Sequence, residues 1–189
     1  NVCSSDLAIP DKIYISLKDM RILTKVDMLM LEMLANCNWE RPLYMAISVG
    51  EVSKLKFDHY FVQEGLAFRF TPFDYKKWGN VKGDNNYAID VERLYENVMN
   101  RYKYGGLDTP GLYLDETTLR TCYYHRRLFA QLAKELIRQG DNTRARKVLA
   151  YAEQAVPAYN VPEIYESGSF DIAKAYAALG EKTKAMQIG

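Results

Sequence analysis

The sequence predicts an α+β fold, in which a small mixed sheet with packed helices is followed by an all-α helical repeat array. Three observations predict it. Short apolar segments with strand-like alternation occur only before residue 112. From residue 115 onward, apolar side chains recur at helical spacing. In that same part, small residues recur at fixed positions relative to bulky ones.

Composition bounds the function classes. The chain has 189 residues with 25 basic and 24 acidic side chains, and a net charge of +1. This balance gives no field that would attract nucleic acid. No apolar run reaches the roughly 18–20 residues that span a bilayer. Three distant cysteines, Cys3, Cys37 and Cys122, predict neither a disulfide framework nor a metal site.

The two ends predict a fragment of a larger protein. The first residue is Asn, and residues 181–189 begin a helix that the chain is too short to complete. Residues 1–11 fit nothing that follows, and we expect a non-native or disordered leader there.

The first elements are a strand and a helix. Residues 12–18 alternate and are rich in Ile and Tyr, which predicts a strand. Thr24 is placed to cap a helix over residues 24–35, and Asp27 favours its positive end. Residues 42–49 are almost continuously apolar, which predicts a central buried strand that begins at Pro42.

A second strand and a loop follow. In residues 66–73 the alternation places Phe68 and Phe70 on one face and Arg69 on the other. Residues 57–61 predict one helical turn, which Gly65 follows as a breaker. The polar residues 74–88 predict a long surface loop. A helix over 90–104 ends at Gly105 and its neighbour.

The remainder is predicted to be helical, so residues 12–112 form an α+β domain and residues 113–189 form the repeats. Asp115 caps a helix to residue 139, and Asp141 opens the next, which ends before Pro157. A third helix covers residues 163–179.

The repeat signal is the most specific pattern. Tetratricopeptide repeats place small residues where helices cross closely and Pro after the second helix. A partial second copy follows at an offset of 40 residues instead of 34, so residues 160–166 predict a lengthened linker. A plain antiparallel bundle is the alternative. The first copy comprises Phe129, Leu132, Ala133, Leu136, Gly140, Ala145, Leu149, Ala152 and Pro157, and the second Ile172, Ala173, Tyr176, Gly180 and Ala185.

Chemistry-bearing residues are few. No catalytic, cofactor-binding or metal-binding motif is present. His59 has Glu64 nearby in the sequence, which leaves a small hydrolase site as a weak alternative. His125 predicts a polar or half-buried helix position. Trp78 lies in the polar loop and either anchors the loop or contacts a partner. Asp115 and the acid after it are explained by helix capping.

Three segments together carry a family resemblance: residues 38–49 (NWERPLYMAISV), 60–70 (YFVQEGLAFRF) and 113–116 (YLDE). In that order they resemble the C-terminal part of a multi-pass membrane family of Bacteroidota, grouped with protein O-mannosyltransferase-like glycosyltransferases. The resemblance covers about residues 12–180. The family-like residues most worth testing are Trp39, Arg41, Pro42, Tyr60, Glu64, Gly65 and Arg69.

The resemblance implies where the chemistry lies. In such families the transmembrane helices and the catalytic acidic residue precede this region. It therefore implies a non-catalytic accessory domain on the periplasmic side of an inner-membrane protein. Its partners would be a protein or peptide acceptor and its own upstream transmembrane region. A stand-alone peptide-binding repeat module is the alternative. For Glu64 and Arg69, an ion pair that fixes the strand entry is favoured over a functional role.

Overall fold

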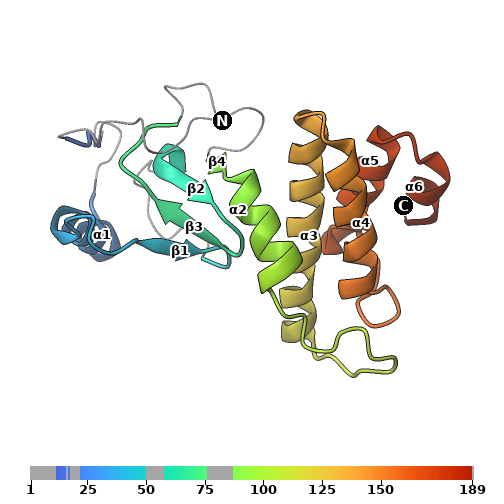
Figure 1. Cartoon of the computed structure of the whole chain (residues 1–189). Helices are drawn as coiled ribbons and strands as arrows, with labels where there is room; N and C mark the ends of the chain where they lie inside the picture. Colours follow the sequence, from blue (N-terminus) through green and yellow to red (C-terminus); the bar gives the residue numbers. More distant parts are fainter. Residues whose placement is uncertain (1–11, 16, 18–21, 50–57, 76–86, 189) are drawn as a thin grey trace. The chain divides into compact units, whose positions relative to one another are not determined.

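The structure is a computed structural model, and it describes residues 12–15, 17, 22–49, 58–75 and 87–188 (Figure 1). The chain divides into two compact units, residues 1–90 and residues 91–189. The first holds helix α1 and a four-stranded sheet, and the second is helical. This agrees with an α+β fold. The predicted leader over residues 1–11 and the loop residue Trp78 lie outside the described residues.

Helix α1, Lys25–Asn36, begins where the sequence predicts. The Thr24 hydroxyl accepts from the Asp27 N–H, and the Asp27 carboxylate accepts from the Thr24 N–H at 2.8 Å, which completes a capping box. Met30 and Leu34 pack against the sheet core. Leu29, which the sequence analysis placed on the same stripe, is 59% exposed.

The sheet has the order β1-β3-β2-β4, with strands Tyr44–Ala46, Phe61–Gln63, Ala67–Phe70 and Ala88–Ile89. β3 pairs antiparallel with both β1 and β2, whereas β2 pairs parallel with β4. The sheet is therefore mixed, as predicted. Its core cluster consists of Tyr60, Phe61, Phe68 and Phe70.

Two strand predictions need correction, and two strands were not predicted. Residues 42–49 do not form a central buried strand, because β1 has three residues and lies at the edge of the sheet. The described residues among 12–18 have no regular secondary structure, although Ile13 and Ile15 pack on the core. β2 and β4 were missed, since each is only two or three residues long, and β4 in addition pairs with β2, which is distant in sequence.

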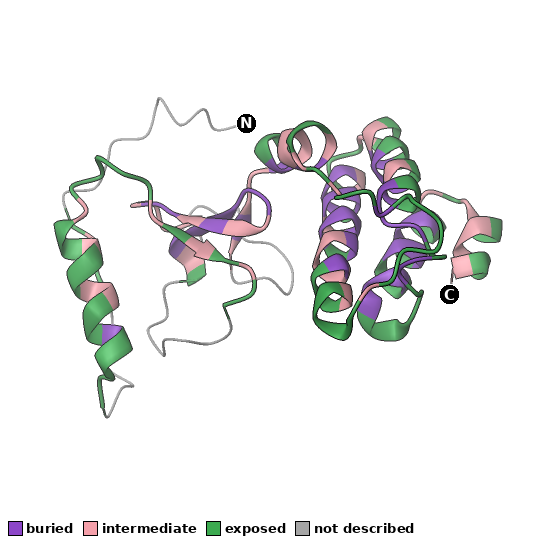
Figure 2. Cartoon of the chain, turned by 90° about the horizontal axis from the view of Figure 1, so that it is seen from below, coloured by how far each residue is buried: buried purple, intermediate pink, exposed green. Residues whose placement is uncertain are grey.

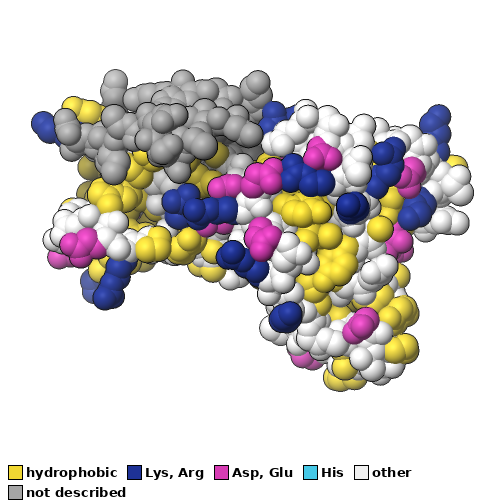
Figure 3. All heavy atoms as spheres, viewed as in Figure 1, with side chains coloured by type: hydrophobic (Ala, Val, Ile, Leu, Met, Phe, Trp, Pro, Cys, Tyr) yellow, Lys and Arg dark blue, Asp and Glu magenta, His cyan; other side chains and the backbone are white. Residues whose placement is uncertain are grey.

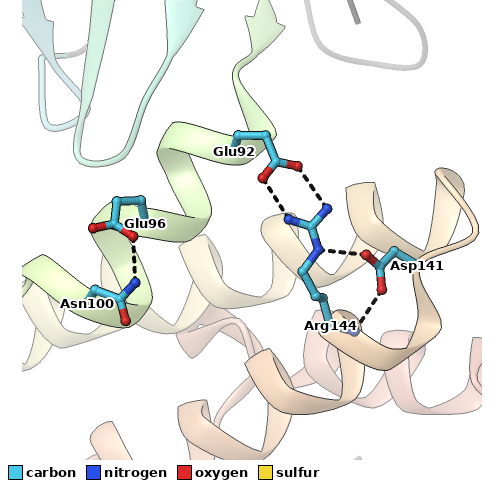
Figure 4. A network of polar contacts seen from close by, with 5 residues as sticks. All are labelled: Glu92, Glu96, Asn100, Asp141 and Arg144. Atoms are coloured by element: carbon cyan, nitrogen blue, oxygen red, sulfur yellow. Dashed lines mark hydrogen bonds and ion pairs between the residues drawn. The ribbon is translucent and has the colours of Figure 1, made fainter.

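The helical unit begins with α2, Val91–Glu96, which continues as the π-helical segment η3, Asn97–Arg101. α2 packs on α3, so the unit boundary falls at residue 90, before the predicted domain boundary at 112. An ionic network holds α2 to α4 (Figure 4). Both guanidinium NH₂ groups of Arg144 donate to Glu92 at 2.8 Å, and its Nε donates to Asp141 at 2.6 Å.

Two helix pairs follow, and three of their four helices begin near their predicted starts. α3 spans Glu116–Arg138, α4 Asn142–Ala155, α5 Ser169–Ala178 and α6 Lys182–Ile188. Asp115 and Asp141 cap α3 and α4 as expected. α5 begins six residues later than predicted, because η4, Tyr165–Ser167, and Gly168 in the left-handed region precede it.

The turns α3–α4 and α5–α6 are the same structure at an offset of 40 residues. The Gly140 N–H donates to Ile137 O and the Asp141 N–H to Leu136 O. In the second pair the Gly180 N–H donates to Ala177 O and the Glu181 N–H to Tyr176 O. Both glycines have a φ of +83°. This pattern is a Schellman motif, in which the left-handed position favours glycine.

The small residues of the repeat pattern are mostly buried. Ala133, Ala145, Ala152 and Ala173 are at most 7% exposed, whereas Ala185 is half-buried. α3 packs on α4 and α5, and α5 packs on α6. In Figure 2 the buried residues run along α3, α4 and α5, while α1 is mainly exposed. Two similar hairpins are thus present, and their assignment to the tetratricopeptide type remains a prediction. Within the described part of the chain, every helix is too short or too polar to cross a membrane.

Candidate functional site

Glu64 and Arg69 form a closed polar cluster on one face of the sheet. Glu64 lies in the β2–β3 turn, and Arg69 in β3 is the cross-strand neighbour of Tyr44 in β1. Arg69 Nε donates to Glu64 Oε1 at 2.5 Å, and the Tyr44 hydroxyl donates to Glu64 Oε2 at 3.1 Å. The Glu64 side chain is 8% exposed. Both carboxylate oxygens are therefore engaged in holding β1 and the turn to β3, as the ion-pair interpretation predicts.

Trp39 has an unusual backbone and an open ring. It follows α1 with a φ of +59°, and Asn38 before it has a φ of +47°. Residues with a side chain rarely adopt this region, so the surrounding structure must hold them there. The indole stacks on Phe70, with ring centroids 5.9 Å apart and planes 10° apart. It is nevertheless 41% exposed, so the core anchors the ring and leaves part of it open.

His59 and Tyr60 precede β2 in the short helix η2, Asp58–Tyr60. Tyr60 is buried, and its hydroxyl donates to Tyr14 O at 3.5 Å. His59 Nε2 lies 3.9 Å from Asp74. Burial, and secondarily the nearby Asp74 carboxylate, raise the pKa of Tyr60. Tyr60 is thus a structural residue that links the sheet core to residues 12–15.

The positions of His59 and Glu64 weigh against the hydrolase hypothesis. His59 lies before β2 and Glu64 after it, so the strand Phe61–Gln63 separates them. The three extended residues of β2 alone add about 10 Å between them. Glu64 is in addition committed to Arg69. The two side chains therefore do not converge on one substrate.

The other sequence-predicted residues do not join this cluster. Arg41 and Pro42 are exposed and precede β1. Gly65 lies in the β2–β3 turn, where its carbonyl accepts from Gln63 Nε2 at 3.2 Å. Among the described residues, no group of three or more His, Cys, Asp and Glu side chains could hold a metal ion.

A pocket in the helical unit was not predicted. Its volume is about 320 Å³. It is bounded by the end of α4, the connection 156–168, the first turn of α5 and the end of α6. Its apolar lining includes Ala152, Val156 and Ile172, and its polar lining Glu153, Tyr159, Glu163, Lys184 and Gln187.

Arg126 forms one wall of this pocket and is 4% exposed. Its two NH₂ groups donate to the carbonyls of Val156, Val161 and Pro162 at 2.6–3.1 Å, and to Ser169 Oγ at 3.3 Å. Burial lowers the pKa of Arg126. The buried guanidinium of Arg126 thus fixes the connection between α4 and α5, which is longer than the corresponding connection in a 34-residue repeat. The helical spacing of Arg126 from Cys122 and Phe129 placed it on the buried stripe, but a charged residue in a polar run did not indicate burial.

Other residues weighed in the sequence are structural. Asp115 Oδ1 accepts hydrogen bonds from the Thr117 and Thr118 N–H groups at 2.9 and 3.1 Å, as a helix cap does. The hydrogen bond from the Thr118 hydroxyl is the main cause that lowers the pKa of Asp115. His125 is half-buried against the rings of Tyr102 and Tyr104, and its Nδ1 has no hydrogen-bond partner in the described structure. Burial lowers the pKa of His125.

Comparison with known proteins finds a similar family for the first unit only. Residues 2–92 match the family model of TMEM260-associated domain 2. The matched segment ends beside the boundary at residue 90, so the family domain and the sheet-containing unit coincide closely. No curated protein and no solved structure matches the chain.

Proposed function

We propose that the chain is a non-catalytic accessory region of a membrane-bound glycosyltransferase-like protein of the protein O-mannosyltransferase type. One observation carries the proposal: residues 2–92 match a domain that is associated with TMEM260, a protein O-mannosyltransferase-like membrane protein. In this proposal an upstream transmembrane region performs sugar transfer. The chain lies on the periplasmic side and recognises the acceptor or a partner protein.

The exposed residues that precede β1 support a contact role for the sheet unit. Trp39 has a partly open ring on a rigid base, and Arg41 and Pro42 are exposed beside it in sequence. Aromatic and arginine side chains dominate the energetics of many protein interfaces. Glu64 and Arg69, by contrast, support the shape of the sheet.

Two measurements test the proposal. The purified chain is incubated with polyprenyl-phosphate sugar donors and a periplasmic extract, and we expect no transfer. In membranes that contain the full-length protein, Trp39→Ala and Arg41→Ala should lower transfer to the acceptor, whereas Tyr113→Ala should not. Transfer by the isolated chain would overturn the assignment of chemistry to the membrane region. Unchanged transfer in both variants would reject acceptor recognition at this surface.

The second candidate is a peptide-binding repeat module. The matched turns at Gly140 and Gly180 and the buried alanines favour it. Pull-down from a periplasmic extract, with and without residues 113–189, separates the two candidates. Partners that are retained after the deletion would argue against binding by the repeats.

A further inference from the structure

We propose that the pocket between α4, the connection 156–168 and α6 is a binding site for a neutral saccharide unit. The pocket lies outside the segment that matches the TMEM260-associated domain. The inference stands on the geometry of the helical unit and does not depend on the proposed function.

The size of the pocket restricts its ligand. Its volume of about 320 Å³ lies at the lower end of the roughly 300–1,000 Å³ that is usual for small-molecule sites. One or two sugar rings fit this space. The walls are also preformed, because Arg126 fixes the connection through its four hydrogen bonds. Little ordering is therefore left to oppose binding.

The charges in the pocket favour a neutral ligand. Lys184 Nζ lies 3.4 Å from Glu153, so this pair compensates itself. Glu163 acts electrostatically on Arg126, whose charge is otherwise surrounded by carbonyl and hydroxyl oxygens. The pocket thus contains two cations and two anions. These charges cancel, so a ligand with a net charge would gain no net electrostatic attraction in the pocket.

The polar groups at the mouth suit hydroxyl groups. Glu163 and Gln187 are exposed lining residues that can accept and donate hydrogen bonds. Tyr159 is 62% exposed, and its hydroxyl donates to Asp108 O at 2.7 Å, so its ring is held in place with an open face. An open aromatic face packs well against the C–H face of a pyranose ring. Carboxylate, amide and fixed ring together favour a saccharide over a purely apolar side chain.

Methyl NMR of the full chain tests the inference. With labelled Ala and Ile, the signals of Ala152, Ile172 and Ile188 report on the pocket. Glucose, mannose and N-acetylglucosamine are titrated to millimolar concentrations, with glucuronate and glucosamine as charged analogues. We expect at least one neutral sugar to shift these signals, and the charged analogues to bind more weakly than glucose.

Variants locate the site. Gln187→Ala and Glu163→Gln should each weaken sugar binding by about 2–10-fold, the value of one hydrogen bond. Tyr159→Ala should weaken it further, whereas Tyr113→Ala, which removes an exposed ring that is not part of the lining, should not. Glu163→Gln should also improve glucuronate binding, because Arg126 then lacks its nearby anion.

Two outcomes would overturn the inference. One is the absence of any shift with every sugar while the protein remains folded. The other is stronger binding of acetyl-leucine-amide than of all sugars, which would assign the pocket to an apolar peptide side chain.

Discussion

The two units of the chain are stabilised in different ways. The helical unit has a continuous core, in which Phe129, Leu132 and Ala133 are fully buried. The sheet unit has strands of two to four residues and a core of four aromatic side chains, with partly buried residues around it. Figure 3 shows hydrophobic side chains over α3 and α4 between charged ones. The closely packed side chains of the helical core cannot shift to fill a cavity, whereas the partly buried residues around the sheet core can.

The largest expected effect compares two buried phenylalanines. Phe129→Ala should cost about 3–5 kcal/mol of unfolding free energy, because Tyr104 and Tyr151 enclose the ring and cannot fill the cavity. Phe70→Ala should fall at or below the lower end of this range, since partly buried neighbours can collapse. Urea denaturation followed by circular dichroism, with hydrogen exchange to locate each unit, measures both. A larger loss for Phe70→Ala would contradict the comparison.

The next effect concerns two adjacent arginines. Arg126→Met should cost about 2–4 kcal/mol, because it leaves buried carbonyl oxygens without donors. Arg127→Met is the matched control: Arg127 is exposed and donates to Glu166 O, so its loss should change stability by less than about 0.5 kcal/mol. Thermal unfolding of both variants checks the difference. Equal losses would show that burial of Arg126 has no special weight.

Two alanines of α4 test the close packing of the hairpin. Ala145 is fully buried and Ala150 is exposed in the same helix. Ala145→Leu should cost about 1–3 kcal/mol through overpacking. Ala150→Leu should be within about 0.5 kcal/mol of wild type. If Ala145→Leu is tolerated as well, α3 and α4 have space between them, and the repeat prediction loses its main support.

Glu64→Gln addresses the sheet unit. The substitution keeps the shape of the side chain and removes the negative charge that the guanidinium of Arg69 contacts. We expect a loss of about 1 kcal/mol, because the Arg69 side chain is 29% exposed and solvent partly screens the pair. Faster hydrogen exchange in β1 and the β2–β3 turn, with unchanged exchange in α3–α6, is the measurement. Altered exchange in the helices would mean that the two units do not respond independently.

The smallest effect depends on pH. Burial lowers the pKa of His125 in the folded state from the ordinary value of 6.5. As pH falls through 6.5, the unfolded chain binds this proton first, so unfolding becomes more favourable. With respect to His125, the folded state therefore has its full stability above pH 6.5, where the imidazole is neutral in both states, and loses stability as the pH falls toward the lowered pKa. His125→Leu should flatten stability between pH 7 and pH 5, while an unchanged slope would assign the dependence to other groups.

Local features of the helical unit were predictable from the chain alone. Asp115 and Asp141 cap their helices, and Gly140 and Gly180 end theirs, because each acts on groups within a few residues. The cap at Thr24 was predicted for the same reason, whereas the reciprocal bond from the Thr24 N–H to Asp27 was not. The small residues at a 40-residue offset also indicated the two similar hairpins.

The sites depended more on distant contacts. The Glu64–Arg69 pair was predicted, because its members are five residues apart across one turn. The separation of His59 from Glu64 was not predicted, since β2 between them was missed. The pocket escaped prediction as well, because its lining comes from positions as distant as Arg126 and Ile188.

The amino-acid order alone determined where α3 and α4 start and where α3 and α5 end, since caps and glycine turns satisfy backbone groups nearby in the chain. Tertiary structure decided which short segments became strands, because β2 and β4 exist only through pairing with each other and with β3. It also decided that β1 is an edge and that Arg126 is buried. The pairing of β1 with β3, the pairing of β4 with β2 and the burial of Arg126 all require partners distant in sequence, and local periodicity carries no record of those partners.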